Sequence, residues 1–287
     1  MERIFMKSYT EFCAKIAGQL FNIIESHDGL LKWKKEWNVA GSQKLPMSHN
    51  GYYRGSNLLY LWMLQNERGW ISNQWLTFLQ VKQNGGHVLK GAKGVEVCFW
   101  KLQELENSSD DSDNKKILPI FRTYTVFNFD QTSLTEQLGV EAQSPVLRDL
   151  LNEHNVQISE FGNQPCYKSG EDVIVMPLRQ YFNQPQDYDV TLLHELVHWT
   201  GRADRLDRPC KRDYAVSDAA RAEEELVAEI GAVFLSGHFG LTGDVVNHAS
   251  YIASWKKYLD AKAVTRAITQ ASQAFHWLIS KVGEKAA

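Results

Sequence analysis

The stretch TLLHELVHWTG, Thr191 to Gly201, places two histidines and a glutamate in an otherwise apolar helical pattern. On a helix, His194 and His198 lie one turn apart on the same face, so their imidazoles can converge on a single ion. Glu195 borders the same position and can accept a proton from a water bound there. This is the spacing of the His-Glu-x-x-His zinc hydrolases, in which the metal lowers the pKa of its water toward about 7.

An acidic helix, expected over residues 219–235, follows the motif and contains EEELVAEIGA. Catalytic zinc takes three protein ligands and a water, so a carboxylate from this helix would complete the set. Glu225 and Glu229 are one turn apart, which suits one carboxylate on the metal and the other on the far nitrogen of a ligand histidine. We favour Glu225 as the metal ligand and Glu229 as the carboxylate that holds a ligand histidine, although the reverse assignment fits the spacing nearly as well. The expected ion is Zn²⁺, with another divalent metal such as Mn²⁺ as the alternative.

The chain of 287 residues is longer than a typical single domain, which favours two domains. Its 44% apolar and 23% charged residues are ordinary for a globular protein. The four cysteines are far apart and form no Cys-x-x-Cys pair, so a disulfide framework is not expected and a reducing cytoplasm is the natural setting. Neither a signal peptide nor a membrane span is apparent, so we expect no membrane partner.

Charge is distributed unevenly, and this favours a polyanion as partner of the front half. Residues 30–101 carry ten Lys or Arg against three acids, whereas residues 102–189 carry fifteen acids against six bases. Six of the nine tryptophans lie in the first hundred residues, and cations interleaved with aromatic side chains are typical of single-stranded DNA binding. The alternative is that tryptophan fills the core and lysine covers the surface. The candidates for phosphate contact are Lys32, Lys34, Lys35, Arg54, Lys82, Lys90, Lys93 and Lys101, and those for base stacking are Trp33, Trp37, Tyr52, Tyr53 and Trp75.

Apolar periodicity predicts an α+β organisation. Helices are expected over residues 12–27, 56–67, 72–84, 144–154, 188–199, 219–235, 244–259 and 262–282, and strands over 95–102, 117–130, 156–159 and 172–176. Residues 130–143 have no periodicity and are the candidate linker, which divides the chain into domains 1–135 and 144–287. Strand 172–176 precedes the motif helix, as an edge strand does in many metallopeptidases, where it can pair with an extended peptide substrate. An ordinary sheet strand is the alternative and fits the sequence at least as well.

Two sets of stretches together resemble one family. In the front half they are LKWKKEW, GYYRGSNLLYLW, NQWLTFLQVKQNGGHVLKGAKGVEVCFW and FRTYTVFNFDQ. In the back half they are DVIVMP, TLLHELVHWTGRADRLDR, EEELVAEIGAVFL and HASYIASWKKYL. They span most of the chain, and in this order they resemble the ArdC-type antirestriction proteins of conjugative plasmids and related mobile elements.

The resemblance implies a mixed α/β domain that binds single-stranded DNA, joined to a zincin-like metallopeptidase domain with a short sheet and an active-site helix. Such proteins are thought to protect incoming DNA from host restriction. The metal pattern carries over onto His194, Glu195, His198 and the glutamates of EELVAE. The family often has Tyr-Ala before Glu-Glu-Leu, where this chain has Arg221-Ala222, and its nearest tyrosine is Tyr214.

We therefore expect a cytoplasmic antirestriction protein that binds single-stranded DNA, with Glu195 as general base of a zinc hydrolase acting on a protein or peptide. The alternative is a protection or replication accessory protein for single-stranded DNA, in which the metal site is structural or vestigial. If the protein is a hydrolase, Tyr214, His238 and Tyr251 are the candidates for stabilising the oxyanion that forms when water attacks the peptide carbonyl.

Overall fold

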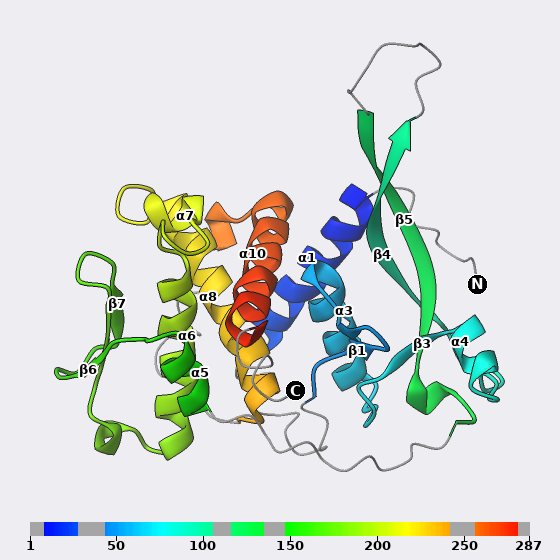
Figure 1. Cartoon of the computed structure of the whole chain (residues 1–287), viewed down its shortest axis with the longest axis horizontal. Helices are drawn as coiled ribbons and strands as arrows, with labels where there is room; N and C mark the ends of the chain where they lie inside the picture. The colour runs from blue at the N-terminus through cyan, green and yellow to red at the C-terminus, as the bar shows by residue number, and fades with distance from the viewer. Residues whose placement is uncertain (1–8, 28–43, 106–115, 135–146, 242–255, 281–287) are drawn as a thin grey trace.

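The computed structural model describes residues 9–27, 44–105, 116–134, 147–241 and 256–280 (Figure 1). Within these ranges the fold mixes helices with three small sheets, as the α+β prediction requires. The candidate linker and the amino-terminal end of the helix predicted from residue 144 lie mostly outside these ranges, as does most of the helix predicted over 244–259. None of the helices in the described part combines the length and apolar character of a membrane span.

The front half begins with helix α1, Tyr9–His27, and with helix α3, Gly55–Glu67, which confirm two predicted helices. Between them, β1, Met47–Ser48, and β2, Gly51–Tyr52, form a short hairpin. The predicted strand pair is also confirmed. Strands β4, Val95–Leu105, and β5, Lys116–Asn128, form a long antiparallel ribbon, and β3, Trp75–Thr77, pairs with the other edge of β5.

The single helix predicted over residues 72–84 is wrong. Trp75 begins strand β3 and pairs with Asn128 of β5, and the helix α4, Phe78–Gln83, starts only after that strand. Thr77 caps α4, because its hydroxyl accepts a hydrogen bond from the Gln80 amide and the Gln80 side chain accepts one from the Thr77 amide. Ladder pairing with a strand about fifty residues away has therefore overridden the local helical pattern.

The back half contains α5, Leu147–Glu153, and a three-stranded sheet of β6, Ile158–Glu160, β7, Cys166–Lys168, and β8, Val173–Met176. The strand order is β6-β8-β7, so β8 is the central strand. The strand predicted over residues 172–176 is confirmed as β8, and it is the ordinary sheet strand of the two alternatives rather than an edge strand, because β6 pairs with one side of it in parallel and β7 with the other side antiparallel. The pairing of β7 was not predicted, since three residues are too few to show an alternating pattern.

Two long buried helices follow the sheet and confirm the predictions around the motif and the acidic stretch. They are α6, Pro185–Thr200, and α8, Asp218–Phe239, joined by a segment that includes α7, Pro209–Arg212. The short 3-10 turns η2, Phe129–Gln131, η3, Arg179–Tyr181, and η4, Lys256–Tyr258, lie in the connections. The last helix, α10, Ala261–Ser280, confirms the final predicted helix.

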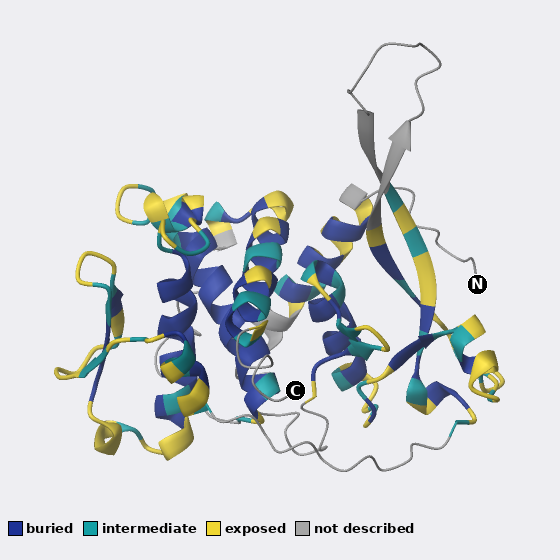
Figure 2. Cartoon of the chain, viewed as in Figure 1, coloured by how far each residue is buried: buried dark blue, intermediate teal, exposed yellow. Residues whose placement is uncertain are grey.

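Helix α10 packs against α8 and α6 of the back half and against α1 and α3 of the front half. One continuous cluster of buried side chains accordingly includes Phe12 and Leu58 from the front half and Val233 and Phe275 from the back half. Figure 2 shows this buried interior running through the helices at the centre of the molecule. The front and back halves, which the candidate linker separates in the sequence, therefore share one hydrophobic core.

Helices α6 and α8 approach closely because α8 has a glycine at their contact. A β-carbon added at Gly231 would lie 2.7 Å from Cγ2 and 2.9 Å from Cγ1 of Val197. Distances below 3.0 Å require the neighbouring atoms to move. The absence of a side chain at Gly231 thus fixes how closely the two helices meet.

We predict that Gly231→Ala lowers the free energy of unfolding by about 1–3 kcal/mol, because the new methyl group overpacks the contact with Val197. Urea denaturation followed by circular dichroism measures the change. Gly18→Ala is the matched control, since Gly18 is also helical and a β-carbon there meets nothing within 4 Å. That variant should be as stable as the wild type or more stable, by up to about 1 kcal/mol. Equal destabilisation by both substitutions would contradict the close approach of the helices.

Candidate metal centre

The motif histidines lie in the middle of α6, where the helix is buried on nearly every side. Pro185 occupies the first turn, and the side chains of Gln184 and Asp187 bond each other's backbone amides, which fixes where the helix begins. From that start, residues 194 and 198 fall on the same face, toward α8. His194 and His198 are both buried, as is Glu195 between them.

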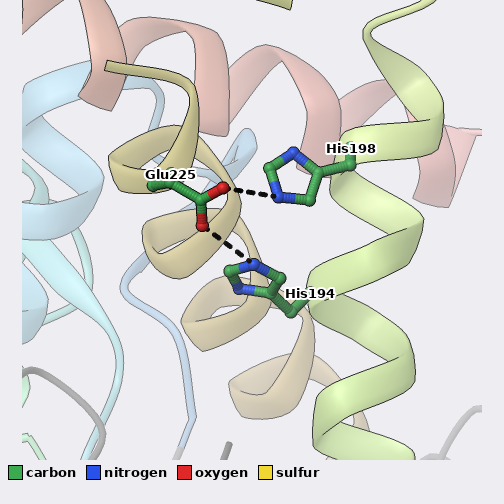
Figure 3. Close-up of side chains that lie close together, drawn as sticks. All are labelled: His194, His198 and Glu225. Carbon is green, nitrogen blue, oxygen red and sulfur yellow. Dashed lines mark ion pairs between the residues drawn. The ribbon is translucent and has the colours of Figure 1, made fainter. Parts of the chain in front are cut away.

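Glu225 of α8 faces the two imidazoles (Figure 3). Its Oε2 lies 3.6 Å from Nε2 of His194, and its Oε1 lies 3.7 Å from Nε2 of His198. One donor atom from each of the three residues lies within 4.8 Å of the others, which meets the condition for holding one metal ion. The two imidazole nitrogens and one carboxylate oxygen are the donor set of many catalytic zinc sites, so these residues fit such an ion.

Other glutamates of α8 hold the far nitrogens of the same histidines. Oε2 of Glu229 lies 3.6 Å from Nδ1 of His194, and Oε1 of Glu224 lies 3.1 Å from Nδ1 of His198. Carboxylates in this position orient an imidazole and make its opposite nitrogen a better ligand. The arrangement therefore favours Glu225 over Glu229 as the carboxylate nearest a shared ion, with Glu229 supporting His194.

Arg208 compensates the fully buried charge of Glu224. Its Nε and Nη2 donate to the two carboxylate oxygens of Glu224 at 2.9 and 2.7 Å, and its other hydrogen bonds reach Thr200 and the carbonyl of Val197. The thiol of Cys210 donates to the same carboxylate over 3.0 Å. Arg208 was not predicted from the sequence as part of the site, because it lies in the connection after α6 and its partners come from both helices.

The electrostatics of the cluster favour positive charge between the glutamates. Burial by itself would lower the pKa of His194, but the carboxylates of Glu225 and Glu229 outweigh burial and raise that pKa to about 10. Burial likewise opposes ionisation of Glu225, but His198, His194 and Tyr214 hold its pKa below the usual range. A proton on the imidazole or a bound cation can each satisfy this excess of negative charge.

Tyr214 also belongs to the cluster. Its hydroxyl donates to Oε1 of Glu225, and burial, reinforced by that carboxylate, raises the pKa of the phenol. Arg221, which occupies the family's tyrosine position, donates to the Tyr214 carbonyl and lies over its ring. Among the other oxyanion candidates, His238 lies thirteen residues beyond Glu225 on α8, about 20 Å along the helix, and contacts Tyr52. Tyr251 lies outside the described residues.

Two of the base-stacking candidates of the front half are not supported by the structure. Trp75 is 1% exposed and Tyr53 is 7% exposed, so neither can present a ring face to a base, and these two predictions are wrong. Tyr52 is half-buried and packs edge-on against His238 and Phe275, and its role in stacking stays a prediction. Burial of Trp75 and Tyr53 in the core explains the two errors.

The phosphate-contact candidates fall into two groups. Arg54, Lys82, Lys90 and Lys93 are exposed and so can reach a polyanion. The other phosphate-contact candidates, Lys32, Lys34, Lys35 and Lys101, lie outside the residues or side chains that the structure describes. The stacking candidates Trp33 and Trp37 lie outside the described residues as well.

Comparison with known proteins assigns each half to a family. Residues 9–127 match the N-terminal domain of the anti-restriction factor ArdC, and residues 145–274 match a zincin-like metallopeptidase family. A DNA primase TraC of Escherichia coli is 32% identical over 259 residues, which are 80% of this chain. The chain spans only 17% of that primase.

Two solved structures of the antirestriction protein ArdC from plasmid R388 have the same fold. The metal-free structure has a TM-score of 0.74 and 30% identity, and it matches 95% of this chain and 98% of its own. The Mn(II)-bound structure has a TM-score of 0.73 and 31% identity over 94% of this chain and 98% of its own. A zincin-like domain and a relative that binds Mn(II) support a divalent metal at the cluster. The chain belongs to the ArdC family of antirestriction proteins.

Proposed function

We propose that the protein protects incoming DNA of a mobile element by combining single-stranded DNA binding in its front half with a metal-dependent peptidase site in its back half. The observation that carries the peptidase part is the convergence of His194, His198 and Glu225 within 4.8 Å. The antirestriction role follows from the family to which the chain belongs.

His194, His198 and Glu225 are the proposed ligands. The donor set is typical of Zn²⁺, and Mn²⁺ is the alternative because the related R388 protein was solved with Mn(II) bound. When bound, the ion would polarise the scissile carbonyl and lower the pKa of the attacking water. Glu229 orients His194 through Nδ1, and Glu224 orients His198 in the same way while Arg208 holds Glu224.

Glu195 is the proposed general base. It follows His194 on α6 and is 4% exposed, so a water reaching it is largely shielded from bulk solvent. Its carboxylate would accept a proton from the attacking water and deliver that proton to the amine of the cleaved peptide bond. The substrate class is a protein or peptide, as in other zincin-like peptidases.

The proposed partner of the front half is single-stranded DNA. Lys82, Lys90 and Lys93 are exposed in the region where cations outnumber acids by ten to three. A related chain is a DNA primase, a protein that acts on nucleic acid. A purely DNA-binding protection or replication accessory protein is the alternative, and the Glu195 experiment below separates it from the peptidase.

We predict that removing the ligand Glu225 has a larger effect on metal binding than removing its neighbour Glu229. Glu225→Ala should bind no stoichiometric Zn²⁺ or Mn²⁺, because one of three ligands is lost. Glu229→Ala should retain metal with affinity reduced about 10- to 100-fold, since it only orients His194. Titration with a chelating dye and metal analysis of the purified variants measure both effects. The reverse order of the two variants would make Glu229 the ligand.

We predict that Glu195→Gln retains the fold and stoichiometric metal but loses peptidase activity by a factor of at least about 10². Cleavage products of an unfolded protein substrate are detected by mass spectrometry, and metal content serves as the control. The same variant is then tested for protection of plasmid DNA during transfer into a restricting recipient. Full protection by a metal-loaded Glu195→Gln protein would show that the proposed peptidase is not needed for antirestriction.

We predict that affinity for oligo(dT) falls steeply with salt, with a slope of log K against log salt near −0.7 for each phosphate contacted. The double variant Lys90→Gln and Lys93→Gln should make the slope less steep by about 1.4. The exposed lysines Lys257 and Lys262 of the back half provide the matched double variant, which should leave the slope unchanged. A slope near zero for the wild type would contradict phosphate binding by the front half.

A further inference from the structure

The surface around α4 exposes large apolar side chains that belong to no core. Phe78 and Leu79 in its first turn are 51% and 63% exposed, and Ile71 and Leu89 on either side of the helix are 70% and 44% exposed. Within α4 itself only Val81 is buried. Figure 2 shows the exposed residues of this helix at one end of the molecule. Exposed apolar side chains gathered in this way commonly mark a binding surface.

The fold holds these residues together through the turn that follows β5. The backbone amide of Leu89 donates to the carbonyl of Gln131, and the Gln131 side chain donates to the carbonyl of Lys93. The amide of Ile71 donates to the carboxylate of Asp130. The loops on both sides of β3 and α4 are thus hydrogen-bonded to the 3-10 turn η2. These hydrogen bonds fix the backbone that carries the exposed apolar side chains.

The segment that carries these apolar side chains is basic. From Arg68 to Gly94 the chain contains no aspartate or glutamate, and its four cations are all exposed: Arg68, Lys82, Lys90 and Lys93. The ammonium of Lys82 lies 5.0 Å from the centre of the Phe78 ring. Asp130 is the acid at the border, and its carboxylate accepts hydrogen bonds from the amides of Ile71 and Ser72.

We propose that Phe78 is a stacking platform for an unpaired base on the ring face opposite the Lys82 ammonium, with Leu79 beside it and Lys82, Lys90 and Lys93 contacting the flanking phosphates. An exposed ring next to cations is the combination that single-stranded nucleic acid requires, because its bases present free faces and its backbone is anionic. This inference rests on the proposed function, and it names a site for the strand. We call the residues Phe78, Leu79, Lys82, Lys90 and Lys93 the α4 patch.

Chemistry distinguishes this occupant from a protein or a membrane. Lysine is depleted in protein interfaces, whereas three of the four cations between Arg68 and Gly94 are lysines. A membrane-binding helix needs a long amphipathic face, and α4 has six residues. In a duplex the bases are already stacked on each other, so the Phe78 ring has no free base face to contact.

The α4 patch lies toward the opposite end of the molecule's longest axis from β7 and α7, which flank the metal-site helices α6 and α8 (Figure 1). None of its residues contributes to the cluster of His194, His198 and Glu225. Substitutions in the α4 patch therefore test strand binding without altering the metal ligands.

The test compares binding of a labelled twenty-nucleotide oligo(dT) to the full-length wild type and variants by fluorescence anisotropy. Phe78→Ala should weaken Kd roughly five-fold to about a hundred-fold, the range expected for one base stacked on one ring. Phe78→Trp should bind at least as tightly as the wild type, because it keeps an aromatic face. Affinity for a duplex of the same length should change less than about two-fold. Phe78 is half exposed, and thermal unfolding confirms that each variant is folded.

Phe161→Ala is the matched control. Phe161 is also 51% exposed and has Lys168 over its ring at 5.3 Å, but Lys168 pairs with Glu171 at 3.6 Å, so the surroundings are not uniformly basic. This variant should bind oligo(dT) as the wild type does. An equal loss in both alanine variants would overturn the specific role of Phe78.

Other results would overturn the proposal in distinguishable ways. If the wild type binds oligo(dT) and Phe78→Ala binds it equally well, strand binding stands and the α4 patch is not its site. If Phe78→Ala instead loses binding to vesicles containing anionic lipid, or loses a co-purified protein, while oligo(dT) binding is unchanged, the patch serves another partner. If the wild type does not bind oligo(dT) even at low salt, the proposed function of the front half fails as well.

Discussion

The back half depends on the balance of charge between two buried helices. Three glutamates of α8, Glu224, Glu225 and Glu229, face two histidines of α6 in a region almost without solvent. An uncompensated buried carboxylate costs several kcal/mol, so each of these groups requires a positive partner. Arg208 provides one permanently, and the imidazoles can provide others by holding a proton or a cation. The cluster is therefore suited to bind a divalent ion and is costly to break up.

The same constraint explains why the connection between α6 and α8 is ordered although it contains little regular structure. Arg208 bonds Glu224 on one helix and the carbonyl of Val197 on the other, while Tyr214 reaches Glu225. Gly231 allows the helices to approach closely enough for these contacts to form. Packing, hydrogen bonding and charge compensation thus act on the same few turns of helix, and the geometry around the histidines is fixed by all three.

The part of the site that is local in sequence could be predicted from sequence alone. His194 and His198 are one helical turn apart, and that spacing fixes their common face without further information. The sequence favoured Glu225 over Glu229 as the ligand only slightly, because the distinction depends on where α8 crosses α6. Arg208 could not be found for a related reason, since its partners are brought together only by the folded chain. The secondary-structure prediction was wrong for the same reason. The local pattern around Trp75 predicts a helix, and only pairing with Asn128 of β5 makes this residue part of a strand.

Helix α10 has a consequence for how the protein can be dissected. It belongs by sequence to the back half, yet it packs against α1 and α3 of the front half. A fragment ending before α10 would expose to water the side chains of α1 and α3 that pack against α10, and it would be prone to association. Truncation is consequently a poor way to assign separate activities to this chain, and the two halves will tend to gain and lose their structure together.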